Sequence, residues 1–177
     1  MKNEHYLYDE DSSLLGAAMD SLAGGDAFLE IGVGGGANLQ RIRNKFRMIV
    51  GTDIEGNRTD ELKDPDAELV LADLASCFRA ESFDTIAFNP PYLPSERIVD
   101  KAVDGGSDGM QVPLEFLSSA LHVLKTGGQI LMLVSDLGAI GRLEEYCRSH
   151  DLKAIRLVEK KLFFETLFVY EITRRQD

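Results

Sequence analysis

Short runs of mostly apolar residues, each followed by a polar or glycine-rich stretch, recur along most of the chain. Such runs are typical of strands that are buried on both faces of a parallel sheet. They predict five strands, at residues 27–31, 48–52, 68–72, 83–88 and 129–134. Two further strands, at 153–159 and 163–173, follow one another without room for a helix, which is typical of an antiparallel pair.

Stretches with helical spacing of apolar residues separate most of these strands. Ser12 or Ser13 is expected to cap the first helix, which ends near residue 22. Its apolar face consists of Leu14, Leu15, Ala18, Met19 and Leu22. Further helices are predicted at residues 37–45, 55–63, 113–124 and 137–149. The alternation predicts an α/β fold with a doubly wound, mostly parallel seven-stranded sheet and an antiparallel edge strand.

The length and composition favour an ordinary globular protein. At 177 residues the chain suits one domain with its own core, so we expect a single domain over residues 1–177. No apolar run approaches the roughly 20 residues that span a bilayer, and the first residues are polar. We therefore expect a cytoplasmic protein without membrane contact. The spacing of its two cysteines and three histidines does not resemble a metal site, and no metal is expected.

The net charge of the chain favours a protein partner over a nucleic acid. The chain has 30 acidic and 19 basic residues and a net charge of −11. Nucleic-acid binding draws on Lys and Arg that neutralise phosphates, so an acidic chain of this size is a poor nucleic-acid binder on its own. A basic protein partner is favoured instead.

The strand at 83–88 ends in the turn Asn89-Pro90-Pro91-Tyr92, which offers several groups to a ligand. Neither proline has an N–H that could continue a strand, and Pro90 biases Asn89 toward an extended backbone. The turn therefore presents an amide side chain, the Pro90 carbonyl and the Tyr92 ring in a rigid arrangement. Ligands of open α/β sheets bind beyond the carboxyl ends of the strands, so this position suits a substrate site.

Glycines lie between the first predicted strand and the next helix, where the backbone can turn tightly beside a ligand. The pattern from Gly32 to Ala37 fits the fingerprint of nicotinamide dinucleotide sites. The pattern from Gly32 to Gly36 fits the loop of S-adenosylmethionine (SAM) methyltransferases, and Gly34 belongs to both. Asp53 closes the second strand, where a carboxylate can accept both ribose hydroxyls of either cofactor.

Two carboxylates favour SAM over a dinucleotide. Glu30 lies inside the first strand, just before the glycines, where it would crowd a pyrophosphate. It would suit the cationic ammonium and sulfonium groups of SAM. Asp73 ends the third strand, where its carboxylate can accept the adenine amino group while the Leu74 N–H faces a ring nitrogen.

The turn at Asn89 suits methyl transfer to a planar nitrogen, a displacement that depends mainly on positioning. The Asn89 side-chain oxygen and the Pro90 carbonyl can accept the two N–H groups of that nitrogen, which favours its developing tetrahedral geometry. Tyr92 can stack on the planar group. We therefore expect Asn89, Pro90 and Tyr92 to be catalytic, acting on an amide or on the exocyclic amino group of a nucleic-acid base.

At these residues the chain resembles the Rossmann-like class I SAM-dependent methyltransferases with an Asn-Pro-Pro-Tyr motif. It resembles most the HemK/PrmC-type protein N5-glutamine methyltransferases. The likeness extends from about residue 8 to residue 174 and includes Glu10-Asp11-Ser12 and Asp104-Gly105-Gly106-Ser107-Asp108-Gly109. The second segment lies in a stretch, 95–112, that is too long for an ordinary connection and is expected to be a functional loop.

The resemblance implies a role for each matching residue. Those at the cofactor would be Ser12, Glu30 and Gly32 near the methionine end, Gly34 in the loop, Asp53 at the ribose, Asp73 and Leu74 at the adenine, and Asn89 beside both the cofactor and the substrate amide.

The few residues before the first helix resemble the short archaeal and eukaryotic branch of this family. That branch acts on the Gly-Gly-Gln glutamine of a class I translation release factor, and its members can require a small zinc-binding activator subunit. The resemblance implies both partners for this chain. The alternative is N-methylation of an RNA or DNA base, with a partner subunit that supplies target recognition. Residues 8–12 lack the proline usual in the family, and Gly35 replaces a common serine or threonine.

Overall fold

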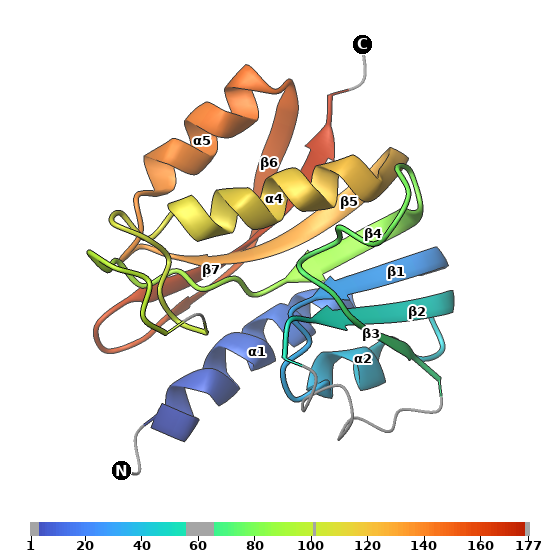
Figure 1. Ribbon diagram of the computed structural model, residues 1–177, viewed down its shortest axis with the longest axis horizontal. Helices are drawn as coiled ribbons and strands as arrows, with labels where there is room; N and C mark the ends of the chain where they lie inside the picture. Colours follow the sequence, from blue (N-terminus) through green and yellow to red (C-terminus); the bar gives the residue numbers. More distant parts are fainter. Residues whose placement is uncertain (1–3, 56–65, 101, 176–177) are drawn as a thin grey trace.

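In the computed structural model, the described residues, 4–55, 66–100 and 102–175, form one seven-stranded sheet flanked by helices (Figure 1). The strands are β1 (Gly25–Ile31), β2 (Phe46–Asp53), β3 (Glu68–Leu71), β4 (Phe83–Phe88), β5 (Leu124–Ser135), β6 (Leu152–Lys161) and β7 (Thr166–Arg174). Their order in the sheet is β3-β2-β1-β4-β5-β7-β6.

Parallel pairing joins β3, β2, β1, β4 and β5, and antiparallel pairing joins β7 to both β5 and β6. The predicted α/β sheet with antiparallel pairing at one edge is confirmed. The strand that runs opposite to the others is β7, which lies between β5 and the outermost strand β6. Because Ile31 of β1 pairs with Phe88 of β4, the segments that follow these two strands leave the sheet side by side.

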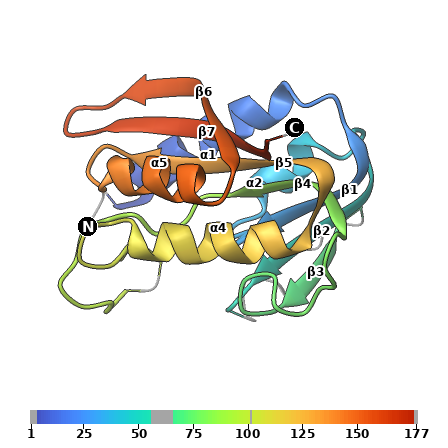
Figure 2. The ribbon, with the colours of Figure 1, turned by 90° about the horizontal axis from the view of Figure 1, so that it is seen from above.

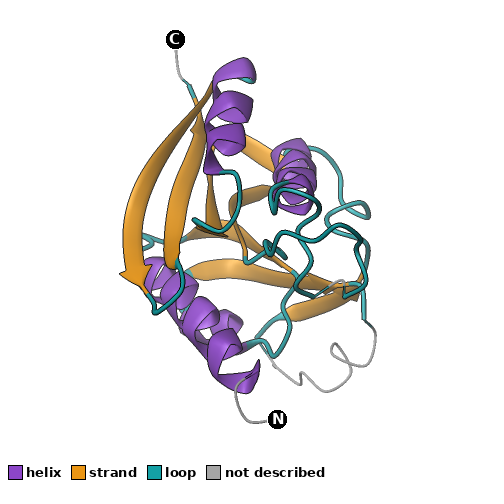
Figure 3. Cartoon of the chain, turned by 90° about the vertical axis from the view of Figure 1, so that its left-hand side faces the viewer, coloured by secondary structure: helices purple, strands orange, loops and turns teal. Residues whose placement is uncertain are grey.

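Helices cover both faces of the sheet, as Figures 2 and 3 show. On one face lie α1 (Glu4–Asp20) and α2 (Ala37–Arg41). On the other lie α4 (Gln111–Val123) and α5 (Ile140–Ser149).

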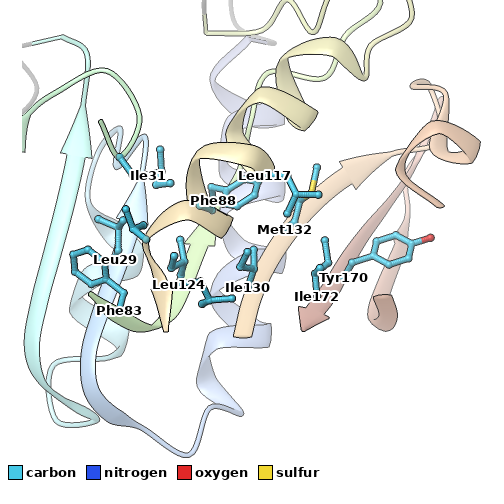
Figure 4. Close-up of a cluster of buried hydrophobic side chains, with 14 of the residues drawn as sticks. Leu29, Ile31, Phe83, Phe88, Leu117, Leu124, Ile130, Met132, Tyr170 and Ile172 are labelled. Atoms are coloured by element: carbon cyan, nitrogen blue, oxygen red, sulfur yellow. The ribbon is translucent and has the colours of Figure 1, made fainter. Parts of the chain in front are cut away.

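Each face has its own hydrophobic core. Phe88 and Leu117 belong to the core between the sheet and α4, which Figure 4 shows in close-up. Leu15, Met19 and Phe28 are fully buried in the core between the sheet and α1. Because both faces of the sheet are packed against helices, the ends of the strands are fixed, and they position the loops at the carboxyl edge of the sheet.

The first helix differs from its prediction. It begins at Glu4, so the predicted cap at Ser12 or Ser13 is wrong and both serines lie inside α1. Neither Gly nor Pro interrupts the acidic residues before Ser12, and the helix continues backward through them. The predicted helix at 55–63 falls almost entirely on residues outside the described part of the chain.

The start of β5 also differs from its prediction. The helix predicted at 113–124 is followed by Gly127 and Gly128, which are typical of a helix end, but β5 begins at Leu124 and includes both glycines. Gly128 lies so close to its neighbour β4 that a Cβ there would be 2.7 Å from the Asp84 carbonyl oxygen. Gly128 therefore allows β5 and β4 to lie close together, and it does not end a helix.

Candidate active site

The glycine loop after β1 folds back on the end of β2. Gly32, Gly34 and Gly36 have φ values of 74°, 51° and 68°, in the left-handed region that favours glycine. The N–H groups of Gly32 and Val33 donate to the Thr52 carbonyl at 2.7 and 3.0 Å. The loop is thus a tight backbone turn, as its glycines predict.

Asp53 fixes this loop through its carboxylate, which is 8% exposed. Its Oδ2 accepts the Gly34 N–H at 3.1 Å, and its Oδ1 accepts the Glu55 N–H at 3.0 Å. Each carboxylate oxygen can accept a further hydrogen bond. The structure therefore brings the predicted residues Gly34 and Asp53 together, with acceptor capacity left for a ligand.

Glu30 is a buried carboxylate directly before the glycine loop, and it is 3% exposed. Its Oε1 accepts a hydrogen bond from Asn38 Nδ2 at 3.1 Å, whereas its Oε2 has no hydrogen-bond partner among the described residues. Burial raises the pKa of Glu30 to about 8, although the Asn38 hydrogen bond acts in the opposite direction. A cationic ligand group beside Oε2 would supply the missing partner and favour the ionised form.

Asp73 and Leu74 follow β3, on the far side of β2 from the glycine loop. Asp73 is exposed, while Leu74 is half-buried against the core under α4 and has a φ of 53°. The next residue, Ala75, donates its N–H to Ser119 Oγ at 3.1 Å, which anchors the segment to α4. This backbone is held in place, and its contact with a cofactor stays a prediction.

The Asn-Pro-Pro-Tyr turn follows β4, next to the glycine loop. Asn89 Oδ1 is buried and has no hydrogen-bond partner among the described residues. Pro90 and Pro91 are both buried. An unsatisfied buried amide oxygen is costly, so a ligand N–H at this position would be stabilised.

Tyr92 is packed more tightly than a freely stacking ring. It is 8% exposed and belongs to the core under α1. Its hydroxyl donates to Asp11 Oδ2 on α1. The stacking role of Tyr92 stays a prediction, and the structure adds a second role, which is to tie the turn to α1.

The loop from Ser95 to Val112 supports this turn from the other side. The Leu93 N–H donates to the Val103 carbonyl at 2.9 Å, and the Gly105 N–H donates to the Leu93 carbonyl at 2.8 Å. A Cβ on Gly105 would lie 2.7 Å from Tyr92 Cα, and one on Gly109 would lie 2.4 Å from the Tyr92 carbonyl oxygen. The glycines therefore allow the loop to pack directly on the backbone of the turn.

Two residues of the site were given no role in the sequence analysis. Asn38 bonds the buried Glu30, and Asp11 bonds Tyr92. Asn38 is the first polar side chain after the glycine loop, which is the available signal for it. Ser12 lies half-buried on α1 next to Asp11, and its contact with a cofactor stays a prediction.

Two kinds of feature are absent from the part of the chain that the structure describes. None of its helices is both long and apolar enough to cross a membrane. No group of three or more His, Cys, Asp or Glu residues in that part could hold a metal ion.

Similarity to known proteins is clear in sequence. No family model matches the chain. It is 33% identical over 147 residues to a Methanocaldococcus jannaschii protein assigned as a protein N5-glutamine methyltransferase, a match that covers 76% of this chain and 74% of that protein. It is 35% identical over 74 residues to the release factor glutamine methyltransferase of Caulobacter vibrioides, across 35% of this chain and 25% of that protein.

The fold is shared with solved methyltransferases. A chain from the E. cuniculi Mtq2–Trm112 complex, which is responsible for methylation of the translation termination factor eRF1, superposes with a TM-score of 0.80 at 24% identity. This match covers 94% of the present chain and 96% of that one. The resemblance seen in the sequence is therefore confirmed. The identity and coverage of the archaeal relative show that this chain belongs to the protein N5-glutamine methyltransferase family.

Proposed function

We propose that this chain transfers a methyl group from SAM to the side-chain amide nitrogen of the glutamine in the Gly-Gly-Gln sequence of a class I translation release factor. The observation that carries the proposal is that Asn89 Oδ1 is buried and has no hydrogen-bond partner among the described residues. Asn89 directly follows β4, the strand that pairs with β1. It offers an acceptor for an amide N–H beside the glycine loop.

The residues of the glycine loop fit SAM as the methyl donor. Oε2 of Glu30, which no described residue bonds, suits the ammonium of the methionine end of SAM, because a cation would stabilise the ionised carboxylate. Gly32 and Gly34 let the backbone approach a ligand closely. In this proposal Ser12 also lies near the methionine end, Asp53 holds the ribose hydroxyls, and Asp73 and Leu74 face the adenine. When bound, SAM supplies an electrophilic methyl group.

The contribution of the turn is positioning. Asn89 Oδ1 and the Pro90 carbonyl accept the two amide N–H groups, which holds the nitrogen in line and favours its tetrahedral geometry. The nitrogen would gain a bond to the methyl carbon as the bond from that carbon to the SAM sulfur breaks and S-adenosylhomocysteine leaves. It would then lose one proton to solvent, so no general base is needed beforehand. Tyr92 lies against the planar amide, while its hydroxyl bond to Asp11 keeps the turn in place.

The proposed partners follow from the relatives and from the charge. The Caulobacter relative is a release factor glutamine methyltransferase, and the E. cuniculi enzyme occurs in a complex with Trm112. We propose that this chain acts in the cytoplasm on a release factor and works with a small zinc-binding activator subunit of its own. A net charge of −11 suits a basic protein partner.

Methylation of the release factor tests this function directly. The purified chain is incubated with methyl-labelled SAM and the cognate release factor, with and without candidate activator subunits, and the Gly-Gly-Gln peptide is analysed by mass spectrometry. We expect one methyl group on the glutamine. No label on that peptide under any of these conditions would contradict the proposal. Label in RNA but not in protein would select base methylation instead.

A further inference from the structure

The hairpin between β6 and β7 exposes two aromatic rings at its tip. Phe163 is 92% exposed and Phe164 is 84% exposed. Their ring centroids are 4.6 Å apart, with the planes at 83°, so the rings contact each other edge to face. We call this pair the aromatic tip. Each Phe side chain can bury about 150–250 Å² in a contact, so the tip is a strong anchor for a partner surface.

The tip rests on a firm base at the carboxyl end of β5. The Leu162 N–H donates to the Glu165 carbonyl at 2.8 Å and closes the turn. Thr166 and Asp136 exchange two hydrogen bonds, from the Thr166 N–H to Asp136 Oδ1 at 2.8 Å and from the Asp136 N–H to the Thr166 carbonyl at 3.0 Å. Ser135 Oγ donates to Glu165 Oε2 at 2.5 Å. A rigid support lowers the entropy lost when the rings are covered.

The aromatic tip lies on the same side of the molecule as the catalytic turn. The strand β5 pairs with β4, which ends at Asn89. Figures 1 and 2 both show the β6–β7 hairpin and the long loop after β4 projecting from the same edge of the sheet. Lys160 forms an ion pair with Glu10 on α1, and the next residue, Asp11, bonds Tyr92. The hairpin is thus connected to the turn through α1.

The charges around the tip indicate the chemistry of the partner. Among the described residues there, the carboxylates of Glu10, Asp136 and Glu165 outnumber the ammonium groups of Lys160 and Lys161. Aromatic rings that stack on nucleic-acid bases need a cationic groove beside them, and anionic lipids also require basic residues. The acidic residues around the aromatic tip instead suit a protein surface that has an apolar recess bordered by Lys or Arg.

We propose that Phe163 and Phe164 dock the protein substrate, inserting into an apolar, basic-rimmed recess of the release factor while its glutamine reaches Asn89. This inference rests on the proposed function. It adds a binding contact outside the residues that hold the cofactor and the amide. The docking contact is made equally before and during methyl transfer, so it acts on substrate affinity rather than on the chemical step.

The test compares steady-state kinetics of the wild type with the double variant Phe163→Ser, Phe164→Ser on intact release factor. We expect KM for the release factor to rise about tenfold or more, with kcat within about twofold of the wild type. SAM affinity and melting temperature should stay unchanged. The matched control is Ile155→Ser on β6, which should leave KM unchanged. Ile155 is 40% exposed and pairs with Glu171, away from the Lys161–Thr166 pair that borders the hairpin turn.

Any other result of this test would contradict the docking role, and each such result points to a different explanation. If the wild type methylates the release factor and the double variant has the same KM, the docking role is overturned while the proposed function stands. A fall in kcat at unchanged KM would also overturn it, because the tip would then serve the site itself. A change of oligomeric state in light scattering, or loss of binding to phosphatidylserine vesicles, would assign the tip to a second copy or to a membrane. A wild type that methylates no release factor would remove the proposed function and the docking role together.

Discussion

The Tyr92 hydroxyl donates a hydrogen bond to Asp11 Oδ2, and this bond joins α1 to the turn after β4 across 81 residues of sequence. Both residues are 8% exposed, so water has little access to replace either partner. Burial raises the pKa of Asp11 to about 6, and the Tyr92 hydrogen bond counters part of this shift. The carboxylates of Glu165 and Glu10 raise the pKa further, and Lys160 lowers it. At neutral pH the turn is therefore held by an ionised, buried acceptor.

Replacing Tyr92 with phenylalanine tests this connection. Tyr92→Phe keeps the ring but removes a donor from the buried Asp11 carboxylate, so the free energy of unfolding should fall by about 1–3 kcal/mol. The loss should be larger at pH 8 than at pH 5, because the hydrogen bond is strongest to the ionised carboxylate. Urea unfolding at both pH values measures it. Equal stability of the variant and the wild type at both would show that the bond contributes nothing.

Glu30 should make the protein without SAM less stable as the pH rises. A carboxyl with a raised folded-state pKa loses its stabilising contribution as the pH climbs from its ordinary 4.5 through about 8. Glu30→Gln abolishes this ionisation, so the variant should exceed the wild type in free energy of unfolding by on the order of 2 kcal/mol at pH 8. The difference should shrink toward pH 4.

The same variant should respond less to SAM, because it has no negative charge to offer the ammonium. Thermal shift with and without SAM at pH 8 measures this response. If Glu30→Gln and the wild type gain the same melting temperature from SAM, Glu30 does not face a cationic part of the cofactor.

Asn89 and Asp53 should separate the chemical step from cofactor binding. Asn89→Ala removes the proposed acceptor for the substrate amide, so kcat should fall by about 100-fold or more while SAM affinity stays within about threefold. Asp53→Ala removes the proposed ribose acceptor and also releases the Gly34 N–H, so SAM affinity should fall by about tenfold or more. Single-turnover assays and calorimetry measure the two effects. The reverse pattern would mean that the two roles are exchanged.

The glycine-rich loop should tolerate no side chain where it meets the turn. Gly105→Ala would put a Cβ 2.7 Å from Tyr92 Cα, so the turn or the loop must shift and kcat should fall at least about tenfold. The matched control is Gly141→Ala in α5, where a Cβ would meet nothing within 4 Å. That variant should keep full activity, and it should gain up to about 1 kcal/mol of stability. Equal activity of both variants would show that the loop does not position the turn.

Local signals explain which elements were predicted correctly. The bounds of β4 are as predicted because an apolar run meets Asn89 and two prolines, which cannot continue a strand. The sequence assigned the glycine loop and Asp53 to the same cofactor, and the structure joins them by a hydrogen bond because β1 and β2 are paired. The start of α1 was missed because its acidic residues resemble a segment that precedes a helix, and nothing local marks Glu4.

Long-range contacts explain what the sequence could not predict. The bond between Tyr92 and Asp11 depends on how α1 packs across the sheet, and no spacing along the chain encodes it. The glycines at 127 and 128 resemble a helix end, and only the neighbouring strand shows that Gly128 is needed for close approach. The burial of Glu30 gives a further example, since its raised pKa arises from desolvation by the assembled core rather than from a neighbour in sequence.

The insertion of β7 between β5 and β6 affects how the chain can fold during its own synthesis. Synthesis of β5 ends at Ser135, but its antiparallel partner β7 begins only at Thr166. Until that segment leaves the ribosome, β5 presents an unpaired edge with fully buried apolar residues on both of its faces. The growing chain is then exposed to aggregation in the same way as other unfinished sheets. An enzyme proposed to act on a termination factor would thus depend on late-translated residues to protect its own central strands.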